Sequence, residues 1–181
     1  MNLMTDRLKI RNLRDKDLDD FLAYRSDPEV CKFQDYEPYT RTESETYIKC
    51  LKNDVFGDAG QWTQLGIELV GANKLIGDIG LKPETNDARI VEFGVSMSRK
   101  YQKHGYATEA LTGIFDYLFT EKAVHRIVGI VDVENTSVIR LIERLKFRRE
   151  AAFLESYWDK TMWRDEFLYA MLKKDWKTNR Q

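Results

Sequence analysis

The run Tyr101–Ala110, which reads YQKHGYATEA, combines a Gln-x-x-Gly-x-Ala turn with the start of a helix. A backbone that turns at Gly105 and then begins a helix leaves several N–H groups without intrahelical acceptors, beside the positive end of the helix dipole. Such a turn binds anions, and a diphosphate would fit it. Because the motif is short, a plain strand-to-helix turn is the alternative interpretation.

This turn needs a strand before it and a helix after it. The apolar run Val91–Met97 supplies the strand, and an apolar stripe at offsets of three and four supports the helix. The members of that stripe are Ala107, Ala110, Leu111, Ile114, Phe115, Leu118 and Phe119. Further along, the strand-like run Arg126–Val133 leads into Asn135–Phe147. One helix face of that second segment carries Val138, Leu141, Ile142 and Leu145.

In this order the two motifs resemble the GNAT superfamily of acetyl-CoA-dependent N-acyltransferases. Within it, the chain is most similar to the branch that contains ribosomal-protein N-terminal acetyltransferases. That likeness rests on the early strand Arg7–Arg11, the segment Ser26–Val30 and the Gly-Tyr-Ala-Thr-Glu-Ala helix entry. It extends from about Asp6 to Trp176. It implies an α/β (α+β) GNAT fold, a single mixed and mostly antiparallel sheet with helices on both faces.

Composition limits the class of protein. A chain of 181 residues, 43% hydrophobic and 33% charged, predicts one globular domain over residues 1–181. The 29 basic and 30 acidic residues nearly cancel, which argues against a nucleic-acid partner. The N-terminus lacks a signal-peptide core and no later stretch suits a membrane helix, so we expect a cytoplasmic protein without a membrane partner. Cys31 and Cys50 form no Cys-x-x-Cys pair, so we expect neither a disulfide framework nor a metal site.

Periodicity predicts the remaining elements. They are a strand at Leu8–Leu13, a helix at Asp15–Ser26, an aromatic-rich connection at Cys31–Thr40, a helix at Glu43–Asn53, a hairpin within Trp62–Leu81 that turns at Gly71–Asn73, and strands at Arg148–Tyr157 and Glu166–Leu172 joined by a turn at Asp159–Thr161.

The resemblance assigns acetyl-CoA as co-substrate and implies its binding residues. The Gln102 turn and the backbone N–H groups after it would meet the pyrophosphate, and those groups belong to Lys103, His104, Gly105, Tyr106, Ala107 and Thr108. Strand groups near Val95 and Met97 would pair with the pantetheine amides. Asn135 would face pantetheine or cap its helix, and both roles can hold. Arg140 would reach the adenosine phosphate, with a solvated helix face as the alternative.

The catalytic residues depart from the family pattern. Ile142 stands where many members carry a proton-donating Tyr, and Val138 stands where related branches carry a Ser. Ser137, one place earlier, is a candidate acid, with helix capping as its alternative role. For the base, Glu92 is the first candidate, with an exposed strand carboxylate as the alternative, and Glu68 in a nearby strand is the second candidate.

These residues predict an N-acetyltransferase in which a primary amine attacks acetyl-CoA directly. The acceptor would be a protein N-terminus or a small amine, with an amine-binding rim at Asp35, Tyr36, Glu37, Tyr39 and Trp62. A homodimer is possible. The alternative function is a non-catalytic acyl-CoA-binding module, because the usual proton donors are missing. Neither a dinucleotide Gly-x-Gly-x-x-Gly turn nor a Walker-type phosphate loop is present.

Overall fold

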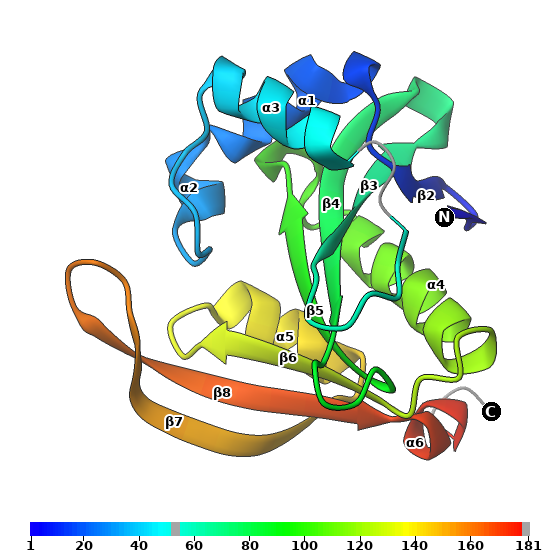
Figure 1. Ribbon diagram of the computed structural model, residues 1–181, viewed down its shortest axis with the longest axis vertical. Helices are drawn as coiled ribbons and strands as arrows, with labels where there is room; N and C mark the ends of the chain where they lie inside the picture. Colours follow the sequence, from blue (N-terminus) through cyan, green and yellow to red (C-terminus); the bar gives the residue numbers. More distant parts are fainter. Residues whose placement is uncertain (52–54, 179–181) are drawn as a thin grey trace.

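The computed structural model describes residues 1–51 and 55–178. Its centre is one eight-stranded sheet in the order β1-β2-β3-β4-β5-β6-β8-β7 (Figure 1). Neighbouring strands of this sheet pair antiparallel, except that β5 and β6 are parallel. The strands are β1 (Asn2–Met4), β2 (Leu8–Asn12), β3 (Thr63–Leu69), β4 (Lys74–Pro83), β5 (Ile90–Met97), β6 (Arg126–Asp132), β7 (Arg148–Trp158) and β8 (Trp163–Leu172). The predicted mixed, mostly antiparallel sheet is therefore confirmed.

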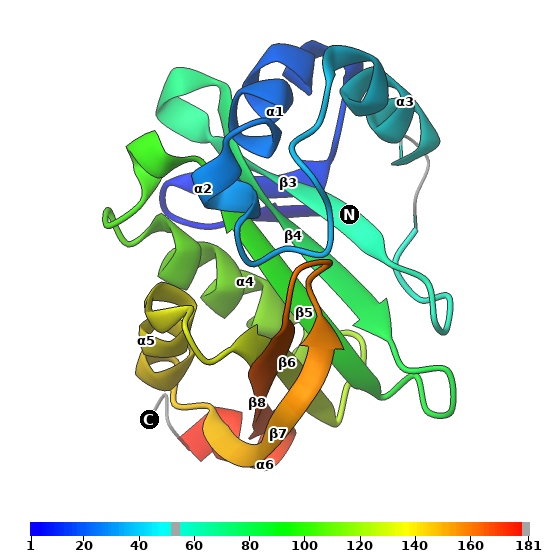
Figure 2. The ribbon, with the colours of Figure 1, turned by 90° about the vertical axis from the view of Figure 1, so that its left-hand side faces the viewer.

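Helices cover both faces of this sheet. They are α1 (Leu18–Arg25), α2 (Pro28–Cys31), α3 (Arg41–Leu51), α4 (Tyr106–Thr120), α5 (Thr136–Arg144) and α6 (Lys173–Thr178). Figure 2 shows β3 and β4 lying between α4 on one side and α1 and α3 on the other. Within the described ranges, no helix has the length and apolar character needed to cross a bilayer.

Three elements were not predicted from the sequence: β1, α2 and α6. They contain 3, 4 and 6 residues, which is too short for a periodic apolar pattern to emerge. The predicted helix Asp15–Ser26 is a 3₁₀ turn at Asp15–Asp17 followed by α1. The predicted helix Glu43–Asn53 corresponds to α3, and its last predicted residues lie outside the described ranges.

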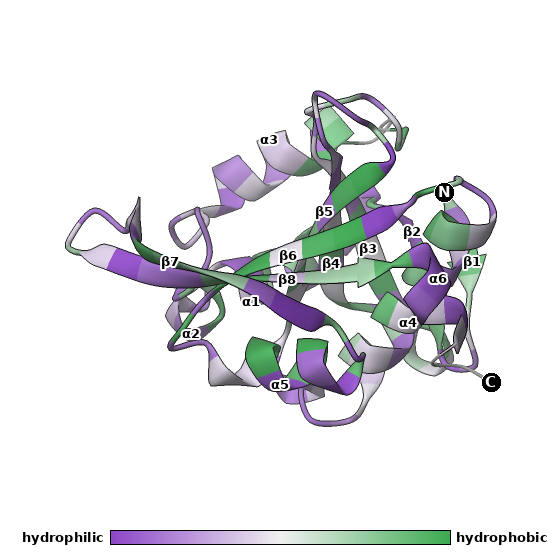
Figure 3. Cartoon of the chain, turned by 90° about the horizontal axis from the view of Figure 1, so that it is seen from below, coloured by the Kyte–Doolittle hydropathy of each residue, from purple (hydrophilic) through white to green (hydrophobic). Residues whose placement is uncertain are grey.

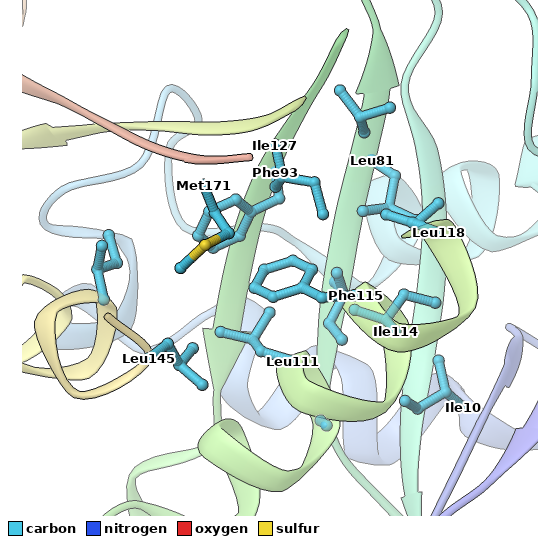
Figure 4. Close-up of a cluster of buried hydrophobic side chains, with 14 of the residues drawn as sticks. Ile10, Leu81, Phe93, Leu111, Ile114, Phe115, Leu118, Ile127, Leu145 and Met171 are labelled. Atoms are coloured by element: carbon cyan, nitrogen blue, oxygen red, sulfur yellow. The ribbon is translucent and has the colours of Figure 1, made fainter. Parts of the chain in front are cut away.

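The main core lies between the sheet and helices α4 and α5. In Figure 4, Phe93 of β5 and Phe115 of α4 point toward one another, and their ring centroids are 5.0 Å apart. Ile127 of β6 and Met171 of β8 close the same cluster, and all four side chains are buried. The apolar stripe of α4 thus fixes the helix, and with it the turn at its N-terminus, against the central strands.

A second core lies on the opposite face, under α1 and α3. Phe21 packs against Tyr24 and stacks on Tyr47, with ring centroids 5.6 and 5.7 Å apart. Leu13 and Leu75 close this cluster from the strand side. This core carries the connection between α2 and α3, so it sets how that connection approaches β5.

The far edge of the sheet is different in character. β7 is an edge strand that is exposed at all but one position. Figure 3 shows it coloured mostly hydrophilic, whereas β5 and β6 are largely hydrophobic. In Figure 1 the turn that joins β7 to β8 extends beyond the body of the sheet, on the side where α2 lies.

Candidate functional site

The central parallel strands β5 and β6 separate partway along their length. They pair at Ile90 with Arg126, at Val91 with Ile127 and at Glu92 with Val128, and no further pair is formed. Beyond this point β5 remains paired with β4, and β6 remains paired with β8. The facing edges of the two strands therefore carry backbone N–H and C=O groups that are free for a ligand.

The predicted anion cradle lies at one end of this opening. Gly105 caps α4 with φ 83°, a left-handed conformation that favours glycine, and Lys103 adopts φ 63°. The first bond of the helix runs from the N–H of Glu109 to the carbonyl of Gly105, at 3.0 Å. The N–H groups of residues 103–108 make no hydrogen bond to any other part of the described chain. These donors at a helix N-terminus fit a pyrophosphate.

Two side chains hold the cradle in place from within. The Nε2 of Gln102 donates to the carbonyl of Met97 at 3.0 Å, which ties the loop to the end of β5. The Nδ1 of His104 lies 2.7 Å from the carbonyl of Gln102. The His104 ring stacks on Tyr106 with centroids 5.8 Å apart. Gln102 therefore shapes the loop with its side chain.

The segment before β2 braces the cradle from behind. Arg7 donates from its backbone N–H and its Nε to the carboxylate of Glu109, at 2.8 and 2.7 Å, and from Nη1 to the carbonyl of His104 at 3.2 Å. Its guanidinium lies 4.5 Å from the centroid of the Tyr106 ring. Burial alone would raise the pKa of Glu109, but hydrogen bonds from Thr5 and Arg7 outweigh it and lower that pKa. A charged brace thus joins the chain's first residues to α4.

A groove of about 720 Å³ runs from the cradle into the gap between the strands. This volume is typical of small-molecule sites. The predicted cofactor residues along it are Val95, Met97, Gln102, Lys103, Gly105, Tyr106, Ala107, Thr108, Asn135 and Arg140. His104 is not among the lining residues. Asn135 also caps α5, because its Oδ1 accepts from the N–H of Val138 at 3.2 Å. We call this the cofactor groove.

A second groove, of about 500 Å³, continues from the first to the other side of the gap. Its walls are the α2–α3 connection, β5, β6 and the β7–β8 turn. The two grooves share Val95, Asn135 and Val138 at the strand gap, and Lys32, Phe33 and Gln34 at the α2–α3 connection. We call the second one the acceptor groove, because a molecule in it would meet the end of a ligand in the first.

Ion pairs shape the rim of the acceptor groove. Lys160 of the β7–β8 turn lies 2.5 Å from Glu37 of the α2–α3 connection, so the two walls touch across the groove. Arg164 of β8 pairs with Asp159 at 2.6 Å and with Glu134 at 2.9 Å. These contacts join segments that lie far apart in the sequence.

The two predicted bases do not line either groove. Glu68 of β3 is buried and accepts from the Nε of Arg11 at 2.6 Å. Burial would raise the pKa of Glu68, but the hydrogen bond and charge of Arg11 outweigh it and lower that pKa. Glu92 forms an ion pair with Lys82 at 2.5 Å. Both carboxylates are paired with a neighbouring cation, and their role as bases stays a prediction.

The predicted acid Ser137 lies on the exposed first turn of α5 and lines the cofactor groove. Ile142, where the family Tyr is missing, is buried and lines the acceptor groove. Val138 lines both grooves. The α5 wall therefore presents hydrocarbon at the junction of the grooves. The described part of the chain contains no cluster of three or more His, Cys, Asp or Glu side chains suited to a metal ion.

Sequence reasoning missed a buried polar network beneath the acceptor groove. Asp78 of β4 is fully buried and accepts from Arg25 Nη2 at 2.7 Å and from the Tyr24 hydroxyl at 2.5 Å. The hydroxyl of Tyr36 lies 3.1 Å from the Oγ of Ser96 on β5. An Asp within an apolar strand was the signal that could have indicated this network, since a buried charge needs a partner.

The predicted amine-binding rim is divided by the structure. Asp35, Tyr36 and Glu37 line the acceptor groove, whereas Tyr39 packs in the second core, with its ring centroid 6.2 Å from that of Phe21. Trp62 lies outside the groove lining, and Lys82 sits 4.9 Å from its ring centroid.

Comparisons with known proteins agree with this geometry. Residues 7–148 match the family model described as an acetyltransferase (GNAT) domain. The uncharacterized N-acetyltransferase p20 of Bacillus licheniformis is 29% identical over 174 residues, which cover 96% of this chain and 97% of that protein.

Solved structures show the same architecture. A GNAT-family acetyltransferase from Bacillus anthracis superposes with a TM-score of 0.88 at 29% identity, covering 96% of this chain and 99% of that one. Spermidine N-acetyltransferase from Vibrio cholerae, solved with CoA and spermine, superposes with a TM-score of 0.80 at 22% identity, covering 96% and 99%. The strand gap, the glycine-capped cradle and the family match lead to one conclusion: this chain belongs to the GNAT family of acetyl-CoA-dependent acetyltransferases.

Proposed function

We propose that the protein transfers the acetyl group of acetyl-CoA to a primary amine that attacks the thioester directly. The observation that carries this proposal is the junction of the two grooves at the gap between β5 and β6. A ligand along the cofactor groove and an amine in the acceptor groove would be held together, with their reacting atoms at the junction. Holding two reactants in this way removes most of the entropic cost of their encounter.

The surroundings of Cys31 support direct attack over a covalent enzyme intermediate. Cys31 lines the acceptor groove, and its thiol donates to the carbonyl of Arg25 at 3.2 Å. Burial raises the pKa of this thiol, with Asp27 and Glu37 adding to the rise and Arg25 opposing it. A thiol held in its neutral form is a poor nucleophile.

In this mechanism the amine nitrogen attacks the thioester carbonyl carbon, and the free N–H groups on the β5 edge stabilise the oxygen that becomes negative. The nitrogen loses one proton to water in the acceptor groove. Asp35 and Glu166 line this groove, and neither has an ion-pair partner within the described ranges. The carbon–sulfur bond then breaks, which leaves the amide and the CoA thiolate.

The charge of the acceptor groove favours an acceptor that arrives as a cation. Its carboxylates outnumber its cations: Asp35, Glu37, Asp132, Asp159 and Glu166 stand against Lys32, Lys160 and Arg164. An ammonium ion would be attracted to this groove before it loses its proton. Polyamines, suggested by the Vibrio cholerae neighbour solved with spermine, and protein N-termini both carry such a group.

A non-catalytic acyl-CoA-binding module is the second candidate, and a specific observation favours it. Ile142 and Val138 present hydrocarbon at the groove junction, where a proton donor is common in the family. Such a protein would bind acetyl-CoA and release no CoA.

The test is the release of CoA from acetyl-CoA in the presence of polyamines, amino acids, aminoglycosides or N-terminal peptides, with a no-amine control. Mass spectrometry of each amine for the added acetyl group identifies the product. We expect amine-dependent release with at least one pool. Tight acetyl-CoA binding without release from any pool would overturn the transferase proposal and favour the binding module.

A further inference from the structure

We propose that Tyr36 is the proton donor to the CoA thiolate, in place of the acid that is missing on α5. This inference rests on the proposed transferase function. Ile142 and Val138 stand where family members carry a proton-donating Tyr or Ser. A transferase without that donor needs another hydroxyl at the junction of the grooves to protonate the CoA thiolate.

Tyr36 lies at that junction, although it comes from a different part of the chain. It belongs to the α2–α3 connection, on the opposite side of the gap from α5, and it lines the acceptor groove. Its hydroxyl lies 3.1 Å from the Oγ of Ser96, which lines the cofactor groove. Ser96 follows Val95, a residue shared by the two grooves. The Tyr36–Ser96 pair therefore spans the boundary where the thioester would lie.

A buried network holds the Tyr36 ring in this position. The guanidinium of Arg25 lies 4.2 Å from the ring centroid. Arg25 is itself fixed by Asp78, which accepts from its Nη2 at 2.7 Å and its Nε at 3.1 Å. Arg25 and Asp78 are both almost fully buried. Because these buried contacts fix the ring, the Tyr36 hydroxyl is preorganised, as a catalytic group must be.

Burial keeps the Tyr36 phenol protonated at neutral pH, so it has a proton to give when the thiolate forms beside it. Burial raises the pKa of Tyr36 above its usual value of 10. Arg25 from α1 opposes this rise and so does the Ser96 hydroxyl from β5, whereas Asp78 from β4 and Cys31 from α2 add to it. At neutral pH the phenol thus retains its proton, and Arg25 stabilises the phenolate once the proton has left.

The protons balance over one turnover. The acceptor ammonium first gives one proton to groove water, and the neutral amine nitrogen then forms a bond to the carbonyl carbon and gives up a second proton to groove water. The carbon–sulfur bond breaks, its electron pair stays on sulfur, and the Tyr36 hydroxyl gives its proton to that sulfur. The Tyr36 phenolate then takes one proton back from groove water, so the net products are one amide, one CoA thiol and one proton released to water.

Tyr157 is the other tyrosine that lines the acceptor groove. It belongs to β7, is 39% exposed and makes no hydrogen bond through its hydroxyl within the described ranges. An exposed hydroxyl without a fixed partner is poorly placed to deliver a proton to one atom. It serves as the rival in the experiment below.

The experiment compares three tyrosine-to-phenylalanine variants, each of which removes one hydroxyl. Tyr36→Phe should lower kcat about a hundredfold, within the range for loss of a general acid, and change the KM for acetyl-CoA less than about threefold. Tyr39→Phe is the matched control, because its ring touches that of Tyr36 but lies in the second core, and it should retain kcat within about twofold. Tyr157→Phe, at the rival tyrosine of the acceptor groove, should lower kcat less than Tyr36→Phe does.

A pH profile separates a proton donor from a structural tyrosine. Because burial raises the pKa of Tyr36 above its usual value of 10, kcat of the wild type should show no fall from loss of this proton below pH 10. Replacement of Tyr36 by a difluorotyrosine, whose phenol is more acidic, should introduce a fall in kcat at high pH that the wild type lacks over the same range. Circular dichroism and acetyl-CoA affinity establish that each variant is folded.

Full activity of folded Tyr36→Phe, or a pH profile that the difluorotyrosine leaves unchanged, would overturn the assignment while leaving the transferase function intact. A loss confined to Tyr157→Phe would assign the role to β7 instead. Absence of amine-dependent turnover in the wild type would count against the proposed function itself.

Discussion

The cofactor groove and the acceptor groove are built in different ways. The cofactor groove depends on backbone: a glycine-capped helix N-terminus, free N–H groups and the edge of β5. The acceptor groove depends on side chains from the α2–α3 connection, β6 and the β7–β8 turn. The cradle of the cofactor groove is one continuous stretch of chain. The acceptor groove forms only when segments that are far apart in the sequence come together in the fold.

This difference explains what each groove can tolerate. Backbone donors recognise a pyrophosphate whatever the neighbouring side chains are, so the cradle can be shared by a whole family. Charged side chains such as Glu37, Lys160 and Arg164 can change without altering the fold, so the acceptor groove can be adapted to different amines. We therefore expect substitutions in the two grooves to affect different substrates.

The largest effect should come from filling the cradle. Gly105→Trp should weaken acetyl-CoA binding more than about a hundredfold, because the residue adopts φ 83° and its backbone belongs to the anion-binding turn. Isothermal titration calorimetry measures this affinity. Gly71→Trp, in an open surface turn, is the control and should bind normally. Tight binding to folded Gly105→Trp would mean that the ligand lies elsewhere.

Glu68 tests whether a candidate base is structural. Glu68→Gln should lower the free energy of unfolding by about 1–3 kcal/mol and leave kcat unchanged, because the buried Arg11 loses one of its two charged partners and keeps Asp17. The pKa of Glu68 is lowered by Arg11, so its contribution is present above pH 4.5 and is lost as the pH falls. Urea unfolding near neutral pH and in acid should show a difference that shrinks in acid. A large fall in kcat without destabilisation would instead make Glu68 catalytic.

Arg7 tests whether the brace behind the cradle matters to the cofactor alone. Arg7→Met should raise the KM for acetyl-CoA about tenfold and leave the KM for the amine unchanged, because Glu109 loses its charged donor and the carbonyl of His104 loses the guanidinium. Steady-state kinetics with each substrate varied in turn measure both values. The control Arg89→Met removes a comparable surface ion pair with Asp87, away from both grooves. Equal changes in both KM values would show a general loss of structure.

The smallest effect should come from the rim of the acceptor groove. Lys160→Met should lower the KM for a cationic amine about threefold, because it frees the carboxylate of Glu37, and Glu37→Gln should raise it. The KM for acetyl-CoA and the thermal midpoint should not change. Lys74→Met, which breaks an exposed pair with Asp20, controls for the loss of a surface charge. A shift in the KM for acetyl-CoA would contradict the separation of the two grooves.

Most of the fold could be predicted because its elements are periodic over their own length. The stripe of α4 and the alternation in β3 and β4 are local patterns. The pattern of either strand alone could not indicate the gap between β5 and β6, since a pairing that stops after Glu92 is a property of two strands together. Short elements such as α2 carried too little pattern to be found.

The candidate cofactor residues and the candidate catalytic residues also differ in how far a local sequence pattern identifies them. Gly105 and Asn135 occupy recognisable positions beside their helices, so the sequence indicated their roles. Glu92 was a reasonable base in an isolated strand, but only the neighbouring strand showed that Lys82 already pairs with it. Tyr36 could not be connected to Ser96 before folding, because they lie 60 residues apart.

By itself, the sequence determined the glycine turn before α4, the helices that support it and the family resemblance, because each depends on residues that are close in the chain. The tertiary structure alone decided which carboxylates are paired, which tyrosine faces the strand gap and where the acceptor groove runs. Those properties depend on which distant side chains share a buried environment, and burial sets both the cost of a charge and the partner that it needs.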